Sequence, residues 1–246
     1  MWQRRVAPGV LTGIVAALAA FSGASAQDAP EPVAVTVDLG FMNTAGNTEV
    51  TTVNAGNKLV YTAAPLVLTQ TFGIVYGRTG DSTTTNQWKA GARLDYQLTP
   101  RVSLFGQGRF ERNTFAGIAR RFEEAIGVAA VLLDAGGHKL TAEAGASLNQ
   151  QTSSITDLTE SFTAGRAATE YRRALTEAAF FTLGGEFLPN FETSEDYRIN
   201  GLAALVAPIS RAIALKASYE VRFDNLPEPS FQKTDRILTT GLQIVF

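Results

Sequence analysis

The last segment of the chain alternates strictly between two faces and ends on an aromatic residue. One face carries Phe246, Ile244, Leu242, Thr240 and Leu238, and the other carries Gln243, Gly241 and Thr239. An apolar strand at the end of a soluble protein invites pairing with other chains, because its edge has free backbone donors and acceptors. A closed β-barrel in lipid removes both the free edge and the exposed apolar face, since the last strand pairs with the first and its apolar face contacts hydrocarbon. The alternative is a strand of a soluble β-sandwich.

The same segment carries a second indication of a barrel. The spacing of Gly241, Ile244 and Phe246 resembles the C-terminal signal that bacterial outer-membrane barrels present to their assembly machinery, although an aromatic residue is commoner at the position of Ile244. We therefore predict that these three residues form an assembly signal. The expected partners during biogenesis are the barrel-assembly machinery and periplasmic chaperones.

The start of the chain predicts export. Arg4 and Arg5 precede an apolar run from Val10 to Phe21, and Ala24 and Ala26 follow it with small-x-small spacing. This pattern is typical of a secretory signal peptide cleaved after Ala26, and the run is too short for a spanning helix. The expected organisation is a cleaved signal peptide over residues 1–26, a short periplasmic leader over 27–32, and a barrel over 33–246.

Period-two alternation continues through the rest of the chain. It is clearest in 33–41, 88–98, 140–149 and 213–224, and weaker segments lie near 49–61, 66–78, 102–111, 121–133, 161–172, 179–189 and 197–207. Two registers are possible in 197–207. With the terminal segment, these predict an all-β fold, a transmembrane antiparallel β-barrel of about twelve strands, within a range of roughly ten to fourteen.

The connections between these segments alternate in length. Short links lie around 63–65, 99–101, 135–137, 173–178 and 208–211, and longer polar links lie around 79–87, 112–120, 151–160, 190–196 and 225–234. Short periplasmic turns and longer extracellular loops produce this asymmetry, whereas a soluble sandwich has no reason to show it. The first link, 43–48, is on the long-link side but is short. Both termini are expected on the periplasmic side.

Composition excludes several kinds of site. The chain has no Cys and a single His, His138, which follows Gly136 and Gly137 in an expected turn. A transition-metal site therefore lacks a ligand set, and a solvated turn residue explains His138 better than a general base does. The 21 basic residues are balanced by 23 acidic ones, so no basic patch indicates nucleic acid. We expect no enzymatic function and no cofactor.

Charged side chains gather on the face opposite the apolar one. The predicted lumen charge network consists of Lys89, Arg93, Asp95, Arg109, Glu111, Glu123, Glu143, Lys216, Glu220, Arg222 and Asp224, with Asp38, Arg166 and Glu186 as further candidates. Because an unpaired charge in a low-dielectric setting is costly, these groups are expected to pair across neighbouring strands. They would either plug the lumen or line a thin aqueous path, and their balance of signs argues against strong ion selectivity.

Short motifs spread over the whole mature chain resemble a known group. They are Thr44-Ala-Gly-Asn-Thr48, Trp88-Lys-Ala-Gly-Ala-Arg-Leu-Asp-Tyr96, Glu111-Arg-Asn-Thr-Phe115 and Tyr219-Glu-Val-Arg-Phe-Asp-Asn-Leu-Pro227, followed by Lys233-Thr-Asp235. In order and spacing the chain resembles the bacterial outer-membrane family of unknown function that includes the salt-induced outer-membrane protein. The family usually has an Asp near Asn113. The resemblance implies an outer-membrane barrel linked by name to salt or osmotic response, and no catalytic residue, cofactor or substrate.

These observations predict an outer-membrane protein of a Gram-negative bacterium, in contact with lipid and lipopolysaccharide and monomeric. Its expected function is a narrow or plugged pore for ions or small solutes, linked to envelope or osmotic stress. Two alternatives stay open. One is a non-conducting structural or recognition barrel that acts through its extracellular loops, and the other is a soluble periplasmic β-protein.

Overall fold

The computed structural model describes residues 32–44 and 50–246. The predicted signal peptide with its cleavage residues Ala24 and Ala26, nearly all of the leader and most of the first link lie outside these ranges. Pro32–Phe246 forms one compact unit. In the described ranges, no helix is long and apolar enough to cross a membrane.

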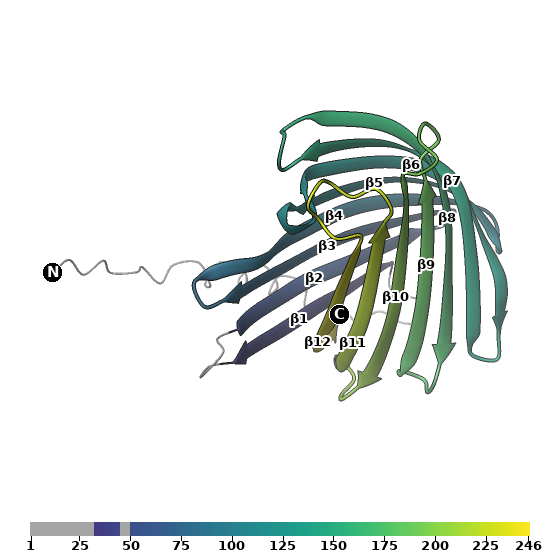
Figure 1. Ribbon diagram of the computed structural model, residues 1–246. Coiled ribbons are helices and arrows are strands. Elements are labelled where there is room, and N and C mark those ends of the chain that lie inside the picture. Colours follow the sequence, from purple (N-terminus) through teal and green to yellow (C-terminus); the bar gives the residue numbers. More distant parts are fainter. Residues whose placement is uncertain (1–31, 45–49) are drawn as a thin grey trace. The chain divides into compact units, whose positions relative to one another are not determined.

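The described residues form twelve strands in one closed antiparallel sheet (Figure 1). The strands are β1 (Val33–Thr44), β2 (Val50–Ala63), β3 (Leu66–Thr79), β4 (Ser82–Thr99), β5 (Val102–Asn113), β6 (Ile118–Ala135), β7 (His138–Ser153), β8 (Thr159–Ala174), β9 (Phe180–Pro189), β10 (Tyr197–Pro208), β11 (Ile213–Asp224) and β12 (Thr234–Val245). Each strand pairs with its neighbours in sequence, and β12 pairs with β1. The prediction of an antiparallel barrel of about twelve strands is confirmed.

The sheet has an apolar outer face and a polar inner face. On β4, Leu94, Tyr96 and Leu98 are exposed on the outside. Arg93 and Asp95, at alternate positions of the same strand, point inward and are partly buried. Because side chains alternate across a strand, this arrangement follows directly from the period-two pattern. A surface that is apolar around the sheet, with polar groups enclosed, is typical of barrels that contact lipid.

The two rims of the barrel differ. One rim holds both ends of the sheet and the connections at 64–65, 100–101, 136–137, 175–179 and 209–212, and we call it the turn rim. The other, the loop rim, holds the connections at 80–81, 114–117, 154–158, 190–196 and 225–233, of which 114–116 form a single 3-10 turn.

One expected connection was wrong. Residues 82–87 belong to β4, so that only Gly80 and Asp81 connect it to β3. The polar composition of this segment indicated a loop, but Thr83, Thr84 and Thr85 are β-branched and favour extended backbone. The end of the β3–β4 hairpin is polar on both faces and continues beyond the apolar part of the barrel.

The terminal residue closes the sheet. The Phe246 backbone N–H donates to the Val35 carbonyl at 2.9 Å, and the Val35 N–H donates to the Phe246 carbonyl at 3.3 Å. The ladder then runs from Thr36 opposite Val245 to Leu39 opposite Leu242. Closure leaves no free edge along this stretch, as a sheet in lipid requires.

Two pairs of glycines mark sharp corners of the barrel. At the β6–β7 junction Gly127 lies opposite Gly145, and a Cβ on either would overlap a backbone carbonyl of the other strand. At the β1–β12 junction a Cβ on Gly241 would overlap the Leu39 carbonyl, and one on Gly40 would lie 2.6 Å from the Thr240 carbonyl. Glycine in a strand permits such a close backbone approach and a tight bend.

These corners lie at opposite junctions of the strand order and divide the barrel into two walls, β1–β6 and β7–β12. In Figure 1, β1–β4 run across the view and β9–β12 run upright. Glu111 on β5 and Arg222 on β11 are six strands apart in the sheet, yet their side chains lie 2.7 Å apart. We therefore describe the barrel as flattened, with its two walls facing each other across a narrow lumen.

Adjacent alanines in the middle of β8 test the facing of the strands. Ala167 is exposed on the outer face, and Ala168 lies on the inner face opposite Glu143 and Glu186. We expect Ala167→Arg to destabilise the barrel by about 2–4 kcal/mol, because an arginine at the midplane of the lipid face is costly. Ala168→Arg should cost less, because acidic partners are adjacent. Reversible unfolding in lipid vesicles measures both, and equal losses would contradict the facing.

Candidate functional site in the barrel lumen

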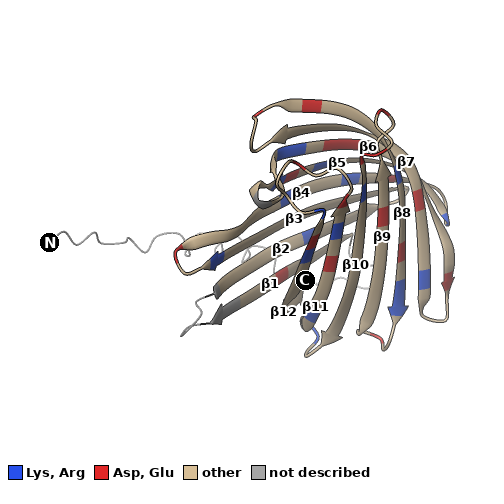
Figure 2. Ribbon diagram, in the orientation of Figure 1, with Lys and Arg blue, Asp and Glu red and all other residues tan. Residues whose placement is uncertain are grey.

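The predicted lumen residues form ion pairs across the sheet or line cavities inside the barrel. Figure 2 shows charges of both signs along the strands. Ion pairs include Lys89, Arg93, Asp95, Arg109, Glu111, Glu123, Glu143, Lys216, Glu220 and Arg222, together with the further candidates Asp38, Arg166 and Glu186. Asp224 is in no ion pair among the described residues, and its carboxylate accepts the Leu226 backbone N–H at 3.0 Å.

One set of seven residues, the first network, forms a continuous chain of ion pairs. In order it runs Asp95, Arg93, Glu143, Arg166, Glu186, Arg109 and Glu123, with N···O distances of 2.7, 2.9, 2.5, 2.8, 3.0 and 2.5 Å. Arginine supports such a chain because its planar group donates to two carboxylates at once. Most of these side chains are largely buried, so their interactions are weakly screened.

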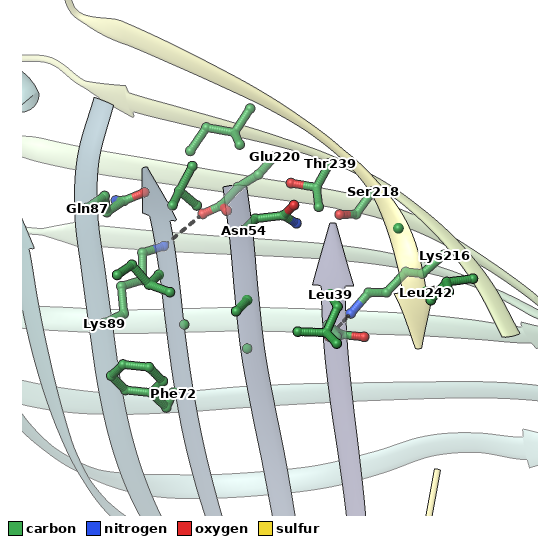
Figure 3. Close-up of a pocket in the computed structure, with 18 of the residues that line it drawn as sticks. Leu39, Asn54, Phe72, Gln87, Lys89, Lys216, Ser218, Glu220, Thr239 and Leu242 are labelled. Atoms are coloured by element: carbon green, nitrogen blue, oxygen red, sulfur yellow. Dashed lines mark hydrogen bonds and ion pairs between the residues drawn. The ribbon is translucent and has the colours of Figure 1, made fainter. Parts of the chain in front are cut away.

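A second network lies nearer the loop rim. It consists of Lys89, Glu220, Arg222, Glu111 and Arg121, joined at 3.1, 2.6, 2.7 and 3.6 Å. Lys89 from β4 and Glu220 from β11 point toward each other across a cavity of about 240 Å³ (Figure 3). The Nη2 atom of Arg222 is buried and has no hydrogen-bond partner among the described residues.

Four ion pairs cross the lumen between the two walls, in addition to the Asp38–Lys216 pair at the β1–β12 junction. They join Arg93 on β4 to Glu143 on β7, Arg109 on β5 to Glu186 on β9, Lys89 on β4 to Glu220 on β11, and Glu111 on β5 to Arg222 on β11. The sequence predicts pairing between neighbouring strands, which describes only some of the contacts, such as Arg109 with Glu123. The difference arises because the flattened barrel brings opposite walls within reach of one side chain.

Phe105 lies at the centre of the first network, and the sequence analysis missed it. Its side chain is only 4% exposed, and the guanidinium carbons of Arg93 and Arg166 lie 4.2 and 5.4 Å from the ring centroid. A Cβ on Gly127 would lie 2.6 Å from the ring, so this glycine also makes room for it. The sequence signal that could have identified Phe105 is its position on the same face of β5 as Gln107 and Arg109.

Arg121 and Arg198 were also missed. Arg121 donates to the Gln151 side chain, and its Nη1 lies 3.6 Å from Glu111. Arg198 is 8% exposed and donates to the Asn149 side-chain oxygen at 3.1 Å. The ambiguous register of 197–207 in sequence concealed the inward direction of Arg198.

A separate polar cluster bridges the β1–β12 junction. The Lys216 Nζ atom donates to Asp38 at 2.5 Å, and the Gln243 amide donates to the other Asp38 oxygen at 2.9 Å. Residues from β11, β12 and β1 therefore hold the closing seam together from the inside.

The remaining polar candidates lie away from these networks. His138 Nδ1 is 2.7 Å from the Tyr171 hydroxyl at the turn rim. Asp81 pairs with Arg78 at 3.5 Å in an exposed turn. Within residues 32–44 and 50–246, no group of three or more His, Asp or Glu side chains is placed to hold a metal ion.

Fold and lumen together define the class: an antiparallel β-barrel of the outer-membrane type with a charged interior. A family model described as "Protein of unknown function, DUF481" matches residues 37–246, and the chain belongs to this family. The "Uncharacterized protein YdiY" of Escherichia coli (strain K12) is 24% identical over 216 residues, covering 87% of this chain and 83% of that protein.

Two solved structures show the degree of likeness. An outer membrane channel from Pseudomonas putida F1 has a TM-score of 0.52 at 13% identity, covering 87% of this chain and 94% of that one. The translocator domain of the autotransporter NalP from Neisseria meningitidis has a TM-score of 0.49 at 14% identity, covering 87% of each chain. At these identities the first likeness supports the barrel fold alone.

Glu143 tests the first network, because it joins Arg93 to Arg166. We expect Glu143→Gln to lower the free energy of unfolding by about 1–3 kcal/mol, since Arg93 keeps only Asp95 and Arg166 keeps only Glu186 as a charged partner. Asp81→Asn, which removes an exposed pair at the loop rim, should leave stability unchanged. Urea unfolding in lipid vesicles measures both, and a neutral Glu143→Gln would show that the network is solvated.

Proposed function

We propose that the protein resides in the outer membrane of a Gram-negative bacterium, with the turn rim in the periplasm and the loop rim outside. The apolar outer face around a closed sheet supports this location. Export by a cleaved signal peptide, contact with lipopolysaccharide and a monomeric state belong to the same proposal. A soluble periplasmic β-protein is the alternative, and extraction from outer membranes only by detergent would exclude it.

The proposed activity is that of a narrow, electrostatically plugged pore for ions or small solutes. The observation that carries this proposal is the set of ion pairs that cross from β4 and β5 to β7, β9 and β11. Such pairs occupy the lumen where an open pore would have water. Cavities of about 280 and 410 Å³ flank them, so the plug is local rather than a filled core.

A link to salt or osmotic stress is part of this proposal. The side chains of Lys89 and Glu220 are 40% and 32% exposed, whereas those of Arg166 and Glu143 are 8% and 18% exposed. Dissolved ions screen solvated pairs more strongly than buried ones. Rising ionic strength would therefore loosen the Lys89–Glu220 pair before the Glu143–Arg166 pair.

Removal of one partner of a cross-lumen pair tests the plug. We expect the wild-type protein to show low conductance in planar bilayers, and Arg93→Ala and Arg222→Ala to increase it, because each removes a side chain that contacts the opposite wall. Each should also lose about 3–5 kcal/mol of stability if the pair is truly buried. Arg101→Ala, in an exposed turn, is the control.

The contrary results are distinct. High conductance in the wild type, with nearly neutral Arg93→Ala and Arg222→Ala, would establish an open pore instead of a plug. No conductance in any variant that migrates as a folded barrel on gels would favour the structural or recognition barrel, which acts through its loops.

We also propose that Gly241, Ile244 and Phe246 form the assembly signal. Phe246 is 59% exposed on the outer face, and its backbone completes the ladder to Val35. Phe246→Asp should block assembly and leave the chain periplasmic and protease-sensitive. Phe191→Asp, at an exposed phenylalanine of the loop rim, should assemble normally. Heat-modifiable migration on gels reads out both, and normal migration of Phe246→Asp would refute the signal.

A further inference from the structure

A chamber of about 280 Å³ lies between the second network and the connection at 225–233. The network supplies Lys89, Glu111, Arg121, Glu220 and Arg222 to the lining, and Pro227, Gln232 and Lys233 come from the connection. The charged lining also includes Arg198, Asp224 and Asp235, together with Arg109, Glu123 and Glu186 of the first network. The chamber thus lies on the loop-rim side of the plug and has residues of the β11–β12 connection in its lining.

The connection is anchored to other loops of the rim. The Glu228 carboxylate accepts the Ser153 hydroxyl at 2.9 Å, and its side chain packs over Gly117, where a Cβ would lie 2.7 Å away. The Asn225 side chain donates to the Glu195 carbonyl at 2.9 Å. Contacts with three other connections or strand ends hold these residues over the barrel mouth.

Four charged groups of the chamber lack an ion-pair partner among the described residues. Arg198 and Lys233 are cations whose side chains donate only to neutral amide oxygens, of Asn149 and Asn225. Asp224 accepts only a backbone N–H, and no side-chain hydrogen bond or ion pair involves Asp235. Arg198 and Asp224 are directly opposite in the β10–β11 ladder, yet the guanidinium turns away toward Asn149.

These groups interleave the two signs over three adjacent strands, because Asp224 is opposite Arg198 and Asp235 is opposite Arg222. Asp224 and Asp235 lie on β11 and β12. Arg198 lies on β10, two strands from Asp235 on β12. Partly enclosed charges are stabilised when a counter-charge reaches them.

We propose that this chamber binds a small zwitterionic solute, one that carries an ammonium and a carboxylate on a short chain. The ammonium would lie against Asp235 on β12, and the carboxylate would accept hydrogen bonds from Arg198 on β10. A single ion would contact one of these two groups and leave the other without a counter-charge. Such a solute would be the substrate of the proposed pore. Its passage through the barrel rests on that proposed function, whereas its binding in the chamber does not.

Isothermal titration of the full-length folded protein in detergent micelles tests the binding. The probes are glycine, β-alanine and 4-aminobutyrate, which differ in charge separation, with acetate and methylammonium as singly charged controls. We expect at least one zwitterion to bind roughly tenfold more tightly than either single ion, because two charge-assisted contacts are made together.

Two variants assign the effect to the chamber. Asp235→Asn should weaken binding of the best zwitterion by roughly tenfold, and should fold normally because no ion pair of the described structure depends on it. Asp157→Asn is the matched control: it removes an exposed acid from another connection of the same rim, at a positive φ that Asn tolerates. Its affinity should equal that of the wild type.

The outcomes separate this inference from the proposed pore. Equal affinity for acetate and 4-aminobutyrate, no binding of any probe, or binding unaffected by Asp235→Asn would each overturn the zwitterion site, even if the barrel conducts. Zwitterion binding that Asp235→Asn weakens, in a barrel that never conducts, would support the site and overturn the pore.

Discussion

Ion pairs between opposite walls are the interaction on which the interior of this barrel depends. One Lys or Arg side chain cannot span a round lumen of this strand number, so Arg222 and Glu111, on strands six apart in the sheet, meet only because the walls approach each other. The approach in turn requires sharp corners, where Gly127, Gly145, Gly40 and Gly241 leave no Cβ in the way. The cross-lumen ion pairs therefore depend on the shape of the backbone.

Much of the fold could be predicted from the sequence, because apolar residues that face lipid alternate with polar residues that face the lumen along each strand. The strand order, the strand count and the closing role of the last segment follow from that period and from the need to pair every backbone group. The β3–β4 hairpin was missed because its residues are polar on both faces, so nothing in their pattern separates an extended strand in water from a loop.

The site could be predicted as a set of residues but not as a set of contacts. Alternation places Arg93, Arg109 and Glu143 inside, yet it carries no information about which strands meet across the lumen. That depends on the glycine corners, which a one-dimensional pattern does not locate. Phe105 illustrates the same limit: its role follows from two guanidinium groups on β4 and β8 that approach its ring.

The two corners are not equivalent. At one, the Gly136–Gly137 turn joins β6 to β7 covalently, and the ladder runs from Ile118–Ser153 to Ala135–His138. At the other, β1 and β12 share only a short ladder, supported by Lys216, Asp38 and Gln243. Under a pulling force, the β1–β12 junction should therefore separate first, while the β6–β7 junction stays paired.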